Sequence, residues 1–226
     1  MGLFSRKKKQ TKEQHDELKK PLGVFDRFKK ENDPNAWSNK GIELGNLGHY
    51  EKSIECFDKI LEVEPNNVWA LNCKGYALNL FGKYEEAMKC SDKMLEVEPN
   101  NVWAWNNKGY AFYLLDKNEE VVECFDKMLE VEPNNVWALN YKGNALSELN
   151  KDNEAIDCFN KALKINPYNA WTWKYKGNSL KKLGKHEEAE ECFVKAKKLE
   201  DEKPKQNIKV SFVNTFLKFI RNFMKS

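Results

Sequence analysis

Apolar residues in the middle of the chain recur at intervals of three and four positions, which is the period of an amphipathic α-helix. Leu71, Gly75 and Leu78 form one such set, and Ala155 and Phe159 belong to another. Short breaks of Gly, Asn or Asp divide these stretches, and a proline follows every second one except the last. The pattern predicts an all-α protein built from short helix–turn–helix pairs.

The pairs repeat with a fixed period. The string Glu-Val-Glu-Pro-Asn-Asn-Val-Trp-Ala begins at Glu62, Glu96 and Glu130, which are 34 residues apart. Lys-Gly pairs keep the same spacing. Five copies follow from this period, at residues 34–67, 68–101, 102–135, 136–169 and 170–202. One helix pair cannot bury its apolar face alone, so we expect the copies to stack into one α-solenoid.

Local signals divide each copy into two helices. An Asn pair such as Asn66-Asn67 suits the start of the first helix, and acidic pairs such as Glu85-Glu86 suit the start of the second. A residue in the left-handed conformation is expected to end each first helix. The expected positions are Gly48, Gly82, Asp116, Asn150 and Gly184.

The repeated positions resemble the signature of the tetratricopeptide-repeat family. In copy four the matching residues are Leu139, Gly143, Leu146, Ala155, Phe159, Ala162 and Pro167. The resemblance covers about three quarters of the chain. It departs from the family at Lys142 and its equivalents, where Leu is common, and at Asp201, where the last proline is missing. The resemblance implies a superhelix whose first helices line a concave groove, and a protein–protein interaction scaffold.

One side of each first helix matches the groove positions of that family. Asparagine amides can hold the backbone of an extended peptide, and Trp and Tyr offer contact area at low entropic cost. The predicted groove residues are Trp69, Asn72, Tyr76, Asn79, Trp103, Asn106, Tyr110, Tyr113, Trp137, Asn140, Asn144, Trp171, Lys174 and Asn178.

Two points about this groove stay open in the sequence. The tryptophans can equally pack into the junctions between copies. Lys174 and Asn178 resemble the first element of a groove that, in this family, clamps the C-terminal carboxylate of a chaperone. No later copy supplies the rest of that clamp, so we do not expect a chaperone adaptor.

Charge and composition exclude several other functions. Residues 34–202 hold 22 Lys and 29 Asp or Glu, which disfavours a nucleic-acid surface and leaves single-stranded RNA stacked on Trp103 and Tyr110 as a minor alternative. We find no phosphate-binding loop and no catalytic motif, and expect neither an enzyme nor a cofactor. Five cysteines share one repeat position without metal-ligand spacing, so we interpret them as small packed residues of a reduced, cytoplasmic protein. These are Cys56, Cys90, Cys124, Cys158 and Cys192.

The two ends differ from the repeats. Residues 1–33 are basic and polar, and Leu22, Phe25 and Phe28 could form a short cap on copy one. No apolar stretch of signal-peptide length follows the early basic run. Residues 203–226 form a predicted basic amphipathic helix, with all apolar side chains of 210–225 on one half of the wheel. That helix could cap the last copy, lie on a membrane surface, or self-associate. If it lies on a membrane, the protein is a peripheral membrane adaptor, which is the alternative function.

Overall fold

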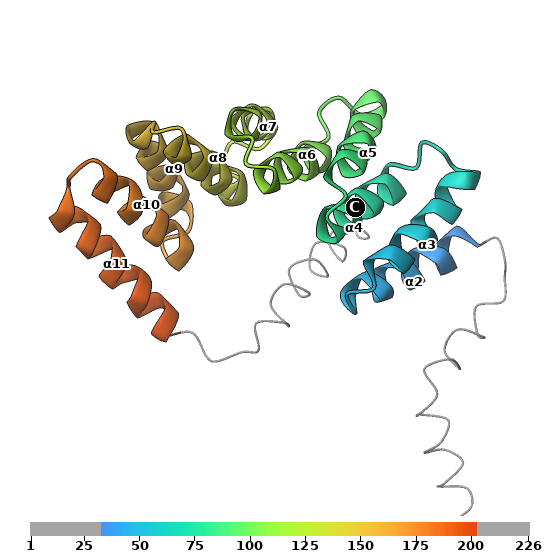
Figure 1. The fold of residues 1–226 in the computed structure, drawn as a ribbon, viewed down its shortest axis with the longest axis horizontal. Coiled ribbons are helices and arrows are strands. Elements are labelled where there is room, and N and C mark those ends of the chain that lie inside the picture. Colours follow the sequence, from blue (N-terminus) through green and yellow to red (C-terminus); the bar gives the residue numbers. More distant parts are fainter. Residues whose placement is uncertain (1–32, 203–226) are drawn as a thin grey trace, which may run out of the picture.

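The computed structural model describes residues 33–202, which form ten α-helices arranged in five antiparallel pairs (Figure 1). The first helices of the pairs are α2 (Pro34–Asn46), α4 (Val68–Phe81), α6 (Val102–Leu114), α8 (Val136–Glu148) and α10 (Ala170–Lys182). The second helices are α3 (Tyr50–Val63), α5 (Tyr84–Val97), α7 (Asn118–Val131), α9 (Asp152–Ile165) and α11 (His186–Asp201). The α-solenoid expected from the sequence is confirmed for this part of the chain.

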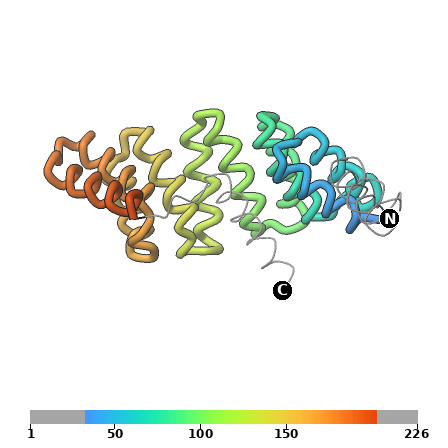
Figure 2. Tube along the Cα trace, turned by 90° about the horizontal axis from the view of Figure 1, so that it is seen from below, coloured from blue at the N-terminus to red at the C-terminus, as the bar shows by residue number. Residues whose placement is uncertain are grey.

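The helices stack in chain order along an arc. Each helix packs against the next one, and first helices also meet the first helices of neighbouring repeats. Figure 2 shows the pairs side by side in one extended row. The predicted N-terminal cap and C-terminal amphipathic helix lie outside the described residues. Within residues 33–202, every helix is too short or too polar to cross a bilayer.

Asparagine and left-handed residues set the helix ends as the sequence predicts. The side chain of Asn67 accepts a hydrogen bond from the Ala70 amide at 2.9 Å, and Asn101 and Asn135 cap α6 and α8 in the same way. Each such cap contributes about 1 kcal/mol to helix stability. Positive φ angles occur at all five expected breaks, including non-glycine residues Asp116 at 55° and Asn150 at 60°.

A phenylalanine of the second helix packs against a glycine of the first helix in most repeats. The rings of Phe57, Phe125 and Phe159 are at most 2% exposed. A Cβ on Gly143 would lie 2.7 Å from Cε1 of Phe159, so only glycine allows α8 and α9 this close. All six cysteines are buried free thiols. Cys124 lies beside Gly109, which confirms its interpretation as a small packed residue.

Candidate functional site

Six aromatic side chains from three consecutive first helices form a continuous cluster. We call Tyr110, Tyr113, Trp137, Tyr141, Trp171 and Tyr175 the aromatic cluster. Ring centroids lie 4.9 Å apart for Tyr113 and Tyr141, 4.7 Å for Trp137 and Tyr141, and 4.2 Å for Trp171 and Tyr175. The cluster therefore joins copies three, four and five.

Tyr141 is the centre of the cluster, and the sequence analysis missed it. Its ring contacts Tyr110 at 6.0 Å and Trp171 at 5.9 Å, in addition to Tyr113 and Trp137. The signal that predicts it is its position four residues after Trp137, which places both rings on one helix face. Tyr175 follows Trp171 at the same spacing.

Burial changes the chemistry of the tyrosine hydroxyls. The pKa of Tyr141 is raised above its ordinary value by burial first, and then by neighbouring tyrosines. Burial also raises the pKa values of Tyr110 and Tyr113. These hydroxyls therefore stay protonated at neutral pH and can both donate and accept hydrogen bonds.

Exposure within the cluster is uneven. The Trp137 side chain is 47% exposed, whereas the other five cluster residues are partly buried. An exposed indole supported by packed aromatic rings is held in place and still available to a ligand. Lys174 and Asn178 of α10 are exposed and lie on the same side of the helix as Trp171.

The structure places most of the predicted asparagines between helices. Asn72, Asn79, Asn140 and Asn144 are at most 8% exposed. Asn79 Nδ2 donates to the Asn107 carbonyl oxygen at 2.9 Å, and Asn107 Nδ2 donates to Asn72 Oδ1 at 2.9 Å. These bonds hold α4 and α6 together, so this part of the predicted set contributes to packing between repeats.

A second asparagine bond repeats this arrangement nearer the C-terminus. The Thr172 hydroxyl donates to Asn140 Oδ1 at 3.0 Å, joining α10 to α8. Asn106 differs, because the residue is partly exposed, but its Oδ1 atom is buried and accepts no hydrogen bond from residues 33–202. The polar groups open to a ligand are thus fewer than the sequence predicts.

The sequence left open whether the tryptophans pack into junctions between copies or stay exposed, and the structure shows both arrangements at different places in the chain. Trp69 Nε1 donates to Ser38 Oγ at 3.0 Å and its ring packs on the core of copies one and two. Trp103 packs against the core between copies two and three. Trp69 and Trp103 therefore fill junctions, while Trp137 is the exposed member of the set. Tyr76 is partly buried, and burial raises its pKa.

The site contains aromatic, amide and lysine groups and no arrangement suited to metal binding. Within residues 33–202, no three His, Cys, Asp or Glu side chains come close enough together to hold an ion. The chemistry that the site offers is non-covalent: stacking, apolar contact and hydrogen bonding.

Comparisons with known proteins agree with this architecture. A family model described as tetratricopeptide repeat matches residues 34–67, 102–135, 136–169 and 170–202, more than half of the chain. A second tetratricopeptide-repeat model matches residues 56–89, and a model of the protein prenyltransferase alpha subunit repeat matches residues 84–115. No curated protein matches the chain.

Solved structures of MamA share the fold. A structure of MamA from Desulfovibrio magneticus RS-1, beginning at its residue 41, is 21% identical with a TM-score of 0.69, over 74% of this chain and 95% of that one. MamA AMB-1 is 26% identical with a TM-score of 0.60, over 72% and 96%. A further MamA crystal structure is 20% identical with a TM-score of 0.66, over 71% of this chain and 94% of that one. These values show that the solenoid architecture is similar.

Proposed function

The chain belongs to the tetratricopeptide-repeat family, and from this premise we propose that its aromatic cluster binds a segment of a partner protein. Family membership supports the general function of a protein-interaction scaffold. The proposal adds a location, the side of α6, α8 and α10 that carries the cluster. It also adds a ligand class, a peptide or helix that presents apolar or aromatic side chains.

The observation that carries the proposal is that Trp137 is exposed while its ring packs against that of Tyr141. Full burial of a large apolar side chain is favourable by about 1.5–3 kcal/mol. Trp137 is 47% exposed, so a ligand that covers it can gain part of this free energy. Trp and Tyr are the residue types that contribute most to protein interfaces. Here they are held by one another, so little side-chain entropy is lost when a partner binds.

Neighbouring polar groups complete the surface. Asn178 and Lys174 are exposed on α10. These groups can bind backbone amides or carbonyls of the partner segment. The buried Asn140 accepts a hydrogen bond from the Thr172 hydroxyl and so joins α8 to α10, two of the helices that carry the cluster.

The test selects peptides and then measures their affinity. A random peptide library is displayed on phage and selected against the full chain, and dissociation constants of the selected peptides are measured by fluorescence anisotropy. Trp137→Ala is expected to weaken binding by at least about tenfold, the minimum for an interface residue worth about 1.4 kcal/mol. Because Trp137 is half exposed, the variant should keep its helical circular dichroism.

Tyr168→Ala provides the matched control. Tyr168 is 74% exposed and lies in the loop between α9 and α10, outside the aromatic cluster. This variant should bind the peptides as the unmodified chain does. Equal losses in both variants, or none in Trp137→Ala, would show that the cluster is not the binding surface.

The membrane alternative depends on residues 203–226, which the structure does not describe. The expected roles of residues 210–225 in membrane binding or self-association therefore stay predictions, as does the cytoplasmic location. Co-sedimentation with vesicles, with and without residues 203–226, tests them directly. Equal sedimentation of both forms would contradict the membrane role.

A further inference from the structure

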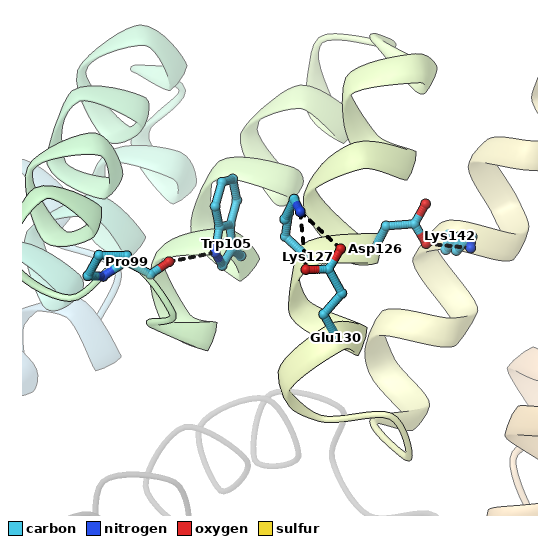
Figure 3. Close-up of polar contacts among 6 residues, drawn as sticks. All are labelled: Pro99, Trp105, Asp126, Lys127, Glu130 and Lys142. Atoms are coloured by element: carbon cyan, nitrogen blue, oxygen red, sulfur yellow. Dashed lines mark hydrogen bonds and ion pairs between the residues drawn. The ribbon is translucent and has the colours of Figure 1, made fainter.

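A recurring set of ion pairs marks the junctions between repeats on another side of the solenoid. A lysine of α4, α6 and α8 contacts an aspartate of the preceding second helix. The pairs are Lys74–Asp58 at 2.5 Å, Lys108–Asp92 at 2.6 Å and Lys142–Asp126. At the first and third junctions a lysine of the second helix also pairs with a glutamate three residues later, Lys59–Glu62 at 2.7 Å and Lys127–Glu130 at 2.9 Å. Figure 3 shows both pairs of the third junction. Each of the first three junctions thus has two positive and two negative groups at these four positions.

The fourth junction lacks both negative groups. Asn160 replaces the aspartate and Lys164 replaces the glutamate, while Lys161 and Lys176 keep the two lysine positions. Among residues 33–202, no ion pair involves Lys161, Lys164 or Lys176. The summed formal charge of these four positions is zero at each of the other three junctions and +3 at the fourth. Copies one to three, residues 34–135, carry 10 Lys and 18 acidic residues, so the reversal stands out against an acidic background.

A hollow lies at this junction between α9 and α10. Its volume is about 510 Å³, and its lining includes the four positions of the group together with Trp173 and Leu163. One carboxylate, Asp157, also lines it, so the lining as a whole stays positive. Three ammonium groups that line one hollow and outnumber its single carboxylate favour an anion there.

The indole of Trp173 forms a fixed wall of the hollow. Its Nε1 donates to the Pro167 carbonyl oxygen at 2.8 Å, and Lys176 Nζ lies 5.5 Å from the ring centroid. The same indole bond occurs two repeats earlier, from Trp105 to Pro99 at 3.4 Å (Figure 3). The indole wall is therefore shared with the second junction, whereas Leu71 and Leu139 hold this position at the first and third. The fourth junction differs from the second by the loss of the aspartate and the glutamate of the group.

We propose that this hollow binds an acidic segment of a partner protein, with carboxylates on Lys161, Lys164 and Lys176 and a side-chain stem against Trp173. Trp173, Lys176 and Asn160 are partly buried, so a ligand must enter the hollow to reach them. A Glu or Asp side chain extends from its backbone and can enter, whereas a flat bilayer surface meets only the exposed lysines. The lysine ammonium group is a compact charge on a flexible stem, so it can move to meet a carboxylate.

The hollow is separate from the aromatic cluster. At about 100° per residue, Trp173 and Lys176 point to the opposite side of α10 from Trp171 and Lys174. A partner could therefore contact both surfaces only by passing around the end of the solenoid, and either proposal can fail while the other holds. The proposal goes beyond the interaction surface proposed above.

The test uses the full chain and a fluorescein-labelled octaglutamate peptide in fluorescence anisotropy. Asn160→Asp/Lys164→Glu installs the residues that the other three junctions already contain, so the fold should tolerate it. We expect this variant to bind the peptide at least about tenfold more weakly, and the loss to shrink at high salt because screening weakens the binding of both forms. The terminal segments are also basic, so the difference between variants is the readout.

Two further variants make the result specific. Lys151→Glu/Asn153→Asp introduces the same change in charge at two exposed positions at the other end of α9, and should leave the affinity nearly unchanged. Asp92→Asn/Glu96→Lys gives the second junction, with Lys93, Trp105 and Lys108, the group found at the fourth. We expect this change to add a second peptide site.

Three outcomes would overturn the proposal. The first is equal affinity of the Asn160→Asp/Lys164→Glu variant and the unmodified chain. The second is an equal loss in the control with matched charge, which would show a general effect of net charge. The third is a Lys164-dependent interaction with inorganic phosphate or with phosphatidylserine vesicles and none with octaglutamate, which would assign the hollow to a different ligand.

Discussion

Gly143 offers a direct test of how closely the paired helices approach. A Cβ at this position would lie 2.7 Å from Cε1 and 2.9 Å from Cζ of Phe159, whose ring is fully buried. Carbon atoms pack favourably at about 3.5–4.0 Å, so Gly143→Ala forces the ring or the helix to move. Such overpacking typically costs about 1–3 kcal/mol of unfolding free energy.

Gly75 supplies the matched control, because it has the same repeat position without the same contact. Copy two has Ser91 where copy four has Phe159, and the nearest atom to a Cβ on Gly75 is Cys90 Cβ at 3.4 Å. Alanine favours a helix over glycine by about 1 kcal/mol, and both substitutions gain this equally. Their difference therefore isolates the clash with the ring, and Gly143→Ala should be less stable than Gly75→Ala by about 1–3 kcal/mol.

The assay is urea unfolding followed by far-ultraviolet circular dichroism, with both variants and the unmodified chain measured together. Gly75→Ala should unfold at the same or a higher urea concentration than the unmodified chain. Gly143→Ala should unfold at a lower concentration than Gly75→Ala. If Gly143→Ala is as stable as Gly75→Ala, the close approach of α8 and α9 is not what requires glycine there.

Two further predictions concern the turns and the buried thiols. Asp116 has a φ of 55°, which is strained for a residue other than glycine. Asp116→Gly should raise the unfolding free energy by about 0.5–1 kcal/mol in the same urea assay, because relief of this strain exceeds the chain entropy that glycine adds to the unfolded state. An unchanged unfolding free energy would contradict this. Burial raises the pKa of the Cys124 thiol from 9.0 to about 12, with nearby Lys108 opposing the shift. Below its unfolded pKa both states are protonated and the thiol contributes no pH dependence, whereas above it the unfolded thiol ionises and stability falls. The urea midpoint should therefore decline less in Cys124→Ala than in the unmodified chain as the pH is raised past about 9, and identical declines would refute the assignment.

Much of the fold could be predicted from local sequence. Asn67 and Asp116 lie at helix ends because their side chains and backbone preferences favour those conformations wherever the chain presents them. Because the same residues recur every 34 positions, a local prediction that is correct for one copy is also correct for the equivalent positions of the others. Phe159 and Gly143 are recognised as repeat positions, but their contact is seen only in the structure.

The candidate site was less predictable, because it depends on contacts between residues about one repeat apart. Asn72 and Asn79 lie on the predicted side of α4, yet α6 approaches closely enough to bury both of them. The same approach brings Tyr141 against Tyr113 and makes it the centre of the aromatic cluster. A helical wheel gives the direction of a side chain and contains no information on how near the next helix lies.

The residue order alone predicts an array of five helix pairs and the residues that cap and end the first helices. These properties follow from hydrogen bonding and burial within one repeat, which the local order of residues specifies. The tertiary structure alone decided which side chains on each first helix stay open to a ligand, and that lysines of α9 and α10 share one hollow with Trp173. Both depend on the rotation between successive repeats, which arises from the packing of many side chains at once and is not a property of any single helix.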